Sequence, residues 1–238
     1  MPLDRVLENE IMDSAVEASD YDAMDHAAVN RLFVDDLLAA IGGLSSPDSS
    51  SQQGDSEKTL DILDLGTGTA QIPIELCQRF QPCRVMAVDA AVSMLDLARY
   101  NLEAAGQTQR IQLAHVDGKA LPFDDGLFDI VMSNSIIHHI PEPIRVLSEA
   151  VRVTKPGGLL FFRDLLRPSD EKQLQTLVSL YAADANEHQR QMFADSLHAA
   201  LSLDEIRDLV ASLGFAAETV NATSDRHWTW SGQSPRRA

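Results

Sequence analysis

The chain has 238 residues, of which 45% are hydrophobic, and its 36 acidic and 19 basic residues leave a formal net charge of −17. This length favours one α/β domain with additions, and no apolar run approaches the ~18 residues that a membrane-spanning helix needs. The negative charge repels phosphate backbones, and the start of the chain lacks the pattern of a secretory signal, so we expect no nucleic-acid partner, no membrane insertion and a cytoplasmic location.

The cysteines give no sign of a metal site. The sequence contains Cys77 and Cys83, and no second pair stands at metal-ligand spacing from them. We therefore predict that both are buried or half-buried residues near the first core helix, and we expect no metal.

The first part of the chain, residues 1–41, is predicted to be a helical cap. Apolar residues recur there at three- and four-residue spacing over 11–41, and Gly42 and Gly43 are expected to end the helix. Residues 42–58 are rich in glycine, serine and glutamine, which predicts a flexible loop.

The remainder, residues 59–238, is predicted to be the core domain, because strands and helices alternate along it. Strands are expected at 60–65, 84–88, 111–115, 128–133 and 159–163, with helices at 71–79, 93–105 and 143–153 and a turn at 155–158. This alternation predicts a doubly wound, mostly parallel sheet that is covered on both faces.

After Asp164 the alternation stops. Residues 165–200 are predicted to be helical throughout, as an insertion, and a helix is expected at 203–213. Two final strands at 216–221 and 226–230 predict an antiparallel hairpin that completes a seven-stranded sheet. Its exposed edge is compatible with a monomer or a homodimer.

The strongest motif is the segment Ile-Leu-Asp-Leu-Gly-Thr-Gly-Thr-Ala at 62–70, where a strand enters a turn with two glycines. In open α/β sheets, ligands bind beyond the carboxyl ends of the strands, where this turn lies. Gln71 replaces the third glycine of a dinucleotide loop. Asp64, just before the turn, repels a pyrophosphate but attracts an ammonium group, which disfavours NAD as the ligand.

Carboxylates also end the next two strands. Asp89 is placed to bind ribose hydroxyls, which serves NAD and S-adenosylmethionine equally well. Asp117, before Gly118, can accept a hydrogen bond from an adenine amino group. Met94 follows Asp89 by about one helical turn, so it either lies on the adenine face or faces the core.

Taken together, these motifs resemble the class I S-adenosylmethionine-dependent methyltransferases, and most of all the small-molecule enzymes of ubiquinone and menaquinone biosynthesis. The resemblance covers roughly residues 60–165 and includes Leu-Pro-Phe at 121–123, Phe-Asp-Ile-Val at 128–131 and Lys-Pro-Gly-Gly at 155–158. It implies a Rossmann-like methyltransferase fold, S-adenosylmethionine as cofactor and a small-molecule methyl acceptor. One departure is Ala70, where the family often has glycine; alanine is small enough to keep the turn.

The cofactor-binding residues that this resemblance implies come from the ends of four strands. They are Asp64, Gly66, Thr67, Gly68, Asp89, Ala90, Met94, Asp117, Gly118 and Asn134.

The loop after the fourth strand lacks the Asn/Asp-Pro-Pro-aromatic motif of enzymes that methylate base or glutamine amino groups. His138 and His139 follow it, at a position that faces the acceptor pocket in the resembling enzymes. An imidazole has a pKa near 7, which suits a general base. We therefore predict His139, and then His138, as a catalytic base or acceptor-orienting group; alternatively, one of the two packs against the following turn.

The resemblance also implies that the N-terminal segment closes over the cofactor and that residues 165–200 form a substrate lid. Tyr21, His26 and Arg190 are therefore candidates for substrate binding, although a core tyrosine, a solvated histidine and an ordinary amphipathic helix explain them as well. Two other functions stay open at this point: an NAD(P)-dependent oxidoreductase and a non-catalytic S-adenosylmethionine-binding protein.

Overall fold

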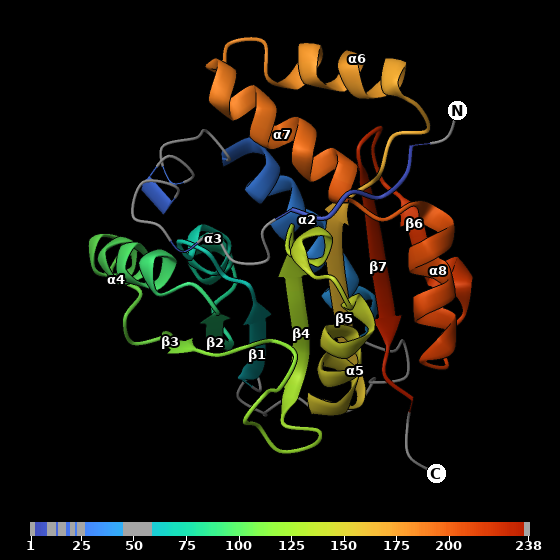
Figure 1. Ribbon diagram of the computed structural model, residues 1–238. Helices are drawn as coiled ribbons and strands as arrows, with labels where there is room; N and C mark the ends of the chain where they lie inside the picture. Colours follow the sequence, from blue (N-terminus) through green and yellow to red (C-terminus); the bar gives the residue numbers. More distant parts are fainter. Residues whose placement is uncertain are drawn as a thin grey trace.

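The protein is built on a seven-stranded sheet with the order β3-β2-β1-β4-β5-β7-β6, seen in a computed structural model that describes residues 3–8, 13, 18–19, 22, 27–44 and 59–235 (Figure 1). The strands β1 to β5 are parallel to one another, whereas β7 pairs antiparallel with β5 and with β6. The strands are β1 (Leu60–Leu65), β2 (Cys83–Asp89), β3 (Ile111–His115), β4 (Phe128–Asn134), β5 (Thr154–Leu165), β6 (Val220–Ala222) and β7 (His227–Gln233). The predicted doubly wound sheet with a C-terminal antiparallel hairpin is confirmed.

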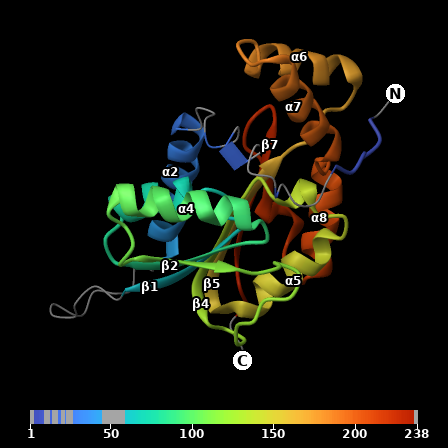
Figure 2. The same ribbon diagram turned by 60° about the vertical axis from the view of Figure 1, so that its left-hand side comes forward.

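Helices cover both faces of the sheet, as the continuous apolar strands require. One face carries α2 (Ala27–Leu44), α3 (Gln71–Arg79) and α4 (Val92–Ala105), and the other carries α5 (Pro143–Val153) and α8 (Leu203–Ser212) (Figure 2). The side chains of β1 alternate between two hydrophobic clusters. Ile62 packs in the cluster between the sheet and the helices α2, α3 and α4, whereas Leu63 and Leu65 pack in the cluster between the sheet and the helices α5 and α8. Trp228 and Trp230 on β7 both lie in the cluster between the sheet and the helices α5 and α8.

The insertion differs from its prediction. Residues 165–200 are not helical throughout but form α6 (Glu171–Tyr181) and α7 (Glu187–Ala199), and Leu166 bridges to Leu201 before them. Each helix has its own N-cap, because the side chains of Asp170 and Asn186 accept hydrogen bonds from backbone N–H groups three residues on. The two helices lie beyond the carboxyl ends of β4 and β5 (Figure 1).

Three further boundaries were predicted wrongly. The turn at 155–158 is part of β5, because Gly157 and Gly158 exchange backbone hydrogen bonds with Ser234 just after β7. Helix α2 does not end at Gly42 and Gly43 but continues to Leu44. The strand at 216–221 is shorter, because a 3₁₀ turn (η2, Ala217–Thr219) precedes β6.

Other features follow the sequence more closely. Cys77 and Cys83 are both buried, and their thiols share a hydrogen bond, with the Sγ atoms 3.8 Å apart and no disulfide between them. None of the helices within the described ranges is long and apolar enough to cross a membrane.

Candidate active site

The turn after β1 requires glycine at its first position. Gly66 has a φ of 70°, and a Cβ atom placed on it would lie 2.1 Å from the Cγ2 atom of Ile136. The N–H groups of Gly66 and Thr67 both donate to the carbonyl of Val88 at the end of β2. The turn is therefore held against β2 on one side and against the loop after β4 on the other.

Asp89 is fixed by the same turn. Its Oδ2 atom accepts a hydrogen bond of 2.8 Å from the N–H of Gly68, and its Oδ1 atom accepts one of 2.8 Å from the N–H of Ala91. Burial raises the pKa of this carboxyl group, and these backbone bonds partly offset the rise. Each carboxylate oxygen keeps a second lone pair, so Asp89 can still accept from a pair of ligand hydroxyls.

A pocket opens at the carboxyl ends of β1, β2, β3 and β4, and we call it the strand-end pocket. Most of the predicted cofactor residues line it together with His139, although they come from separate strands. The predicted residues among its lining are Gly66, Gly68, Asp89, Ala90, Met94, Asp117, Gly118, Asn134 and His139.

A second, smaller hollow adjoins this pocket, and we call it the Asp64 hollow. It is lined by Asp64 and Thr67, and it shares Gly66 and Asn134 with the strand-end pocket. Asp64 is 3% exposed, and burial raises the pKa of its carboxyl group to about 7. Its Oδ2 atom and the Oδ1 atom of Asn134 are buried and accept no hydrogen bond from the described residues. Two such acceptors fit a ligand that brings N–H donors, such as an amino group.

Three polar residues that line the Asp64 hollow were not predicted as site residues: Asn30, Thr69 and Gln71. Asn30 on α2 donates to the side chain of Gln71 at 3.2 Å, and Gln71 donates to Asp22 at 3.0 Å. Gln71 was considered only as a missing glycine, and Asn30 lies on an amphipathic helix with no local signal. The N-terminal part of the chain therefore contributes to this hollow.

Asp117 and Met94, which were predicted to lie beside the adenine, also contact other residues of the chain. The Oδ1 atom of Asp117 accepts from the backbone N–H of Lys119 at 2.9 Å, and the Lys119 ammonium lies 3.1 Å away. Met94 lines the strand-end pocket and is also buried beside Ala91 and Ala18.

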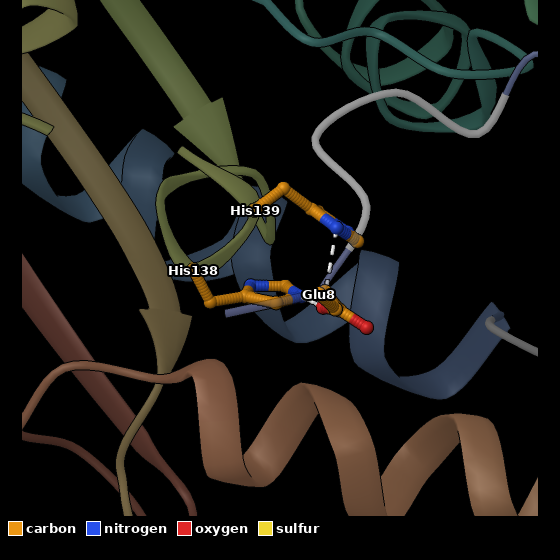
Figure 3. A group of neighbouring side chains, drawn as sticks. All are labelled: Glu8, His138 and His139. Atoms are coloured by element: carbon orange, nitrogen blue, oxygen red, sulfur yellow. Dashed lines mark ion pairs between the residues drawn. The ribbon is translucent and has the colours of Figure 1, made fainter. Parts of the chain in front are cut away.

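The two adjacent histidines face different surroundings. Both lie in a 3₁₀ turn, η1 (Ile137–His139), which follows β4. His138 is buried; its Nδ1 atom lies 2.5 Å from Oδ1 of Asp164, and it is not among the described residues that line the strand-end pocket. His139 lines that pocket, and its Nδ1 atom lies 3.1 Å from Oε1 of Glu8 (Figure 3).

Glu8 was not predicted, and it arrives on a segment that we call the N-terminal strap, residues 3–8. The guanidinium of Arg5 donates to the carbonyls of Ala199, His138 and Ile140, at 2.7, 3.1 and 3.0 Å. The strap therefore ties the end of α7 to η1 and places Glu8 beside both imidazoles.

Of the three predicted substrate-binding residues, only Arg190 falls within the described residues. Tyr21 and His26 lie outside the described residues. Arg190 is exposed on α7 and is not among the residues that line either hollow.

A mostly parallel sheet with this strand order, a glycine turn after β1 and acidic residues at or just after the ends of β2 and β3 define a Rossmann-like fold with a pocket at the strand ends, where such folds bind their ligands. A family model described as a methyltransferase domain matches residues 63–162. The chain belongs to this methyltransferase family, and it is an S-adenosylmethionine-dependent methyltransferase.

Two relatives illustrate the membership, and one solved structure shares the fold. The chain is 30% identical over 203 residues to the malonyl-(acyl-carrier protein) O-methyltransferase of Geobacter sulfurreducens, which covers 85% of this chain and 68% of that protein. It is 32% identical over 165 residues to the demethylmenaquinone methyltransferase of Protochlamydia amoebophila, with coverages of 65% and 68%. A structure from Methanococcus maripaludis, described as an S-adenosyl-L-methionine-dependent methyltransferase, shares the fold with a TM-score of 0.70 at 15% identity, covering 98% of each chain.

Proposed function

We propose that this enzyme binds S-adenosylmethionine across the strand-end pocket and the Asp64 hollow and transfers its methyl group to a small-molecule acceptor. The observation that carries the proposal is the adjacency of the two hollows around the glycine turn, one with the fixed carboxylate of Asp89 and one with the buried carboxylate of Asp64. A net charge of −17 disfavours nucleic acid as the acceptor.

Each part of the cofactor has a matching set of residues in this arrangement. Asp64, with Thr67 and Asn134, would hold the amino group of the methionine part, and the backbone at Gly66 and Gly68 lets the ligand approach closely. Asp89 would accept from the ribose hydroxyls, with Ala90 beside it. Asp117, Gly118 and Met94 would surround the adenine. When bound, the cofactor supplies a methyl group on a sulfonium, which is already activated for displacement.

His139 is the predicted catalytic residue that lines the pocket, so we propose that it meets the acceptor, as a base or as an orienting group. Because the donor is activated, holding the acceptor atom in line with the methyl group and sulfur provides much of the rate. His138, bound to Asp164, acts instead as a positioning residue that fixes η1.

Calorimetric titration tests the proposal directly. We expect S-adenosylmethionine and S-adenosylhomocysteine to bind with one site per chain, and NADH not to bind, because Asp64 would face a pyrophosphate. Failure of both sulfur ligands to bind would refute the proposed function. Binding of NADH in their place would favour the oxidoreductase alternative.

The titration of Asp64 predicts how binding depends on pH. Because burial raises the pKa of Asp64 to about 7, the carboxyl group is mostly ionised at pH 8 and mostly protonated at pH 6. Only the ionised form attracts the cofactor ammonium, so we expect the affinity for S-adenosylhomocysteine to fall about tenfold from pH 8 to pH 6. The Asp64→Asn variant should bind weakly with a flatter pH dependence. An equally steep fall in that variant would assign the effect to another group.

A further inference from the structure

We propose that Glu8, His138 and His139 bind a divalent transition-metal ion, and that the ion presents open coordination positions to an oxygen atom of the methyl acceptor. The part concerning the acceptor rests on the proposed function, whereas the metal site itself does not. The three residues come from two segments that lie far apart in the sequence, the N-terminal strap and η1 (Figure 3).

The spacing of the three side chains suits such an ion. The Oε1 atom of Glu8 lies 3.1 Å from Nδ1 of His139 and 3.5 Å from Nε2 of His138, and the three atoms lie within 4.8 Å of one another. Ligands around a tetrahedral zinc ion with bonds of about 2.0–2.1 Å stand roughly 3.3 Å apart. In addition, this Oε1 atom is buried and accepts no hydrogen bond from the described residues, as expected of an oxygen that serves a cation.

The surroundings of His138 match the second layer of a metal site. Metal-binding histidines usually donate their other ring N–H to a carboxylate, which fixes the tautomer. Here Nδ1 of His138 lies 2.5 Å from Oδ1 of Asp164, so its Nε2 atom is left to act as the ligand. Asp164 is itself held by the backbone N–H groups of His138, at 3.1 Å, and Leu165, at 2.6 Å.

The position of Glu8 does not depend on attraction to the histidines alone. Arg5 anchors the strap through three carbonyls, and the N–H of Val6 donates to the carbonyl of His198 at 3.1 Å. Because the carboxylate is already held beside two imidazoles, less free energy is needed to bring the metal ligands together. Two histidines and one carboxylate leave positions open, as in catalytic zinc and iron sites.

The location gives the ion a chemical role. His139 also lines the strand-end pocket, so the proposed ion would lie at the wall of that pocket, and its open positions would face an acceptor bound there. An acceptor hydroxyl bound to the ion loses its proton to water more readily. Its oxygen then forms a bond to the methyl carbon while the carbon–sulfur bond breaks, and the electron pair of that bond stays on sulfur. The products are the methylated oxygen acceptor, S-adenosylhomocysteine and one proton, and His139 has the orienting role.

Titration of the chelator-treated full chain with Zn²⁺ and Co²⁺ tests the site. We expect one Zn²⁺ per chain and, with Co²⁺, the intense visible absorption of a four- or five-coordinate site. The Glu8→Gln and His139→Gln variants should each weaken Zn²⁺ binding at least tenfold, and Asp164→Asn by about tenfold. The matched control is Glu142→Gln, whose side chain is 69% exposed just before α5 and should bind Zn²⁺ like the wild type.

Equal Zn²⁺ affinity in the wild type and Glu8→Gln would overturn the proposal, as would only the pale absorption of octahedral Co²⁺ in the wild type. The Co²⁺ spectrum of the wild type tests the metal site even if a variant does not fold. Unchanged binding of S-adenosylhomocysteine in Glu8→Gln shows that the variant is folded. Because that ligand is measured separately, loss of the metal site and failure of the proposed function give different results.

Discussion

Replacing Asp89 by alanine should weaken binding of S-adenosylhomocysteine about 100-fold or more. The carboxylate would lose its bonds to the ribose hydroxyls, and the N–H groups of Gly68 and Ala91 would lose their acceptor. Hydrogen bonds to a charged group are worth about 1.5–3 kcal/mol each, so the loss of two corresponds to at least 100-fold in affinity. Calorimetry on the two proteins measures this difference.

The matched control for this variant is Asp96→Ala on α4. The Asp96 side chain is 64% exposed and lies 3.7 Å from Arg99, so its removal should leave ligand affinity within twofold of the wild type. If Asp89→Ala bound the ligand as tightly as Asp96→Ala, Asp89 would not be a ribose ligand.

Replacing Gly66 by alanine should lower the free energy of unfolding by about 3 kcal/mol and abolish measurable cofactor binding. A left-handed φ costs a non-glycine residue about 1–2 kcal/mol, and the new Cβ would also displace Ile136 from the wall of the strand-end pocket. Urea unfolding gives the stability, and calorimetry with S-adenosylhomocysteine gives the binding.

Gly106→Ala separates the two contributions. Gly106 has a φ of 66° at the end of α4, but a Cβ atom there meets nothing within 4 Å. This variant should therefore lose only about 1 kcal/mol. The double variant Gly66→Ala/Ile136→Ala should recover part of the loss, because the clash is removed. Equal destabilisation by Gly66→Ala and Gly106→Ala would mean that the contact with Ile136 does not matter.

The cofactor half of the candidate site could be predicted from the sequence because its residues stand at the ends of strands. In a parallel sheet these ends meet at one edge, so Gly66, Asp89 and Asp117 lie close together regardless of how the other segments pack. The acceptor half was less predictable. The prediction of two catalytic histidines did not show that His138 turns to Asp164 while His139 faces the pocket.

One error in the predicted fold has the same origin, and another does not. The segment at 155–158 has the composition of a turn, yet Gly157 and Gly158 pair with Ser234, which lies far along the chain. The break between α6 and α7 is set by the cap at Asn186, which is a local signal and could have been recognised.

The sequence by itself determined the class of fold, the glycine turn and the carboxylates that follow the strands, because apolar periodicity and turn chemistry act between near neighbours. Only the tertiary structure decided that the strap carries Glu8 to His138 and His139, that Asn30 reaches the Asp64 hollow and that Asp164 is the partner of His138. Those contacts join residues from distant parts of the chain, and their geometry depends on how the helices and the strap pack against the finished sheet.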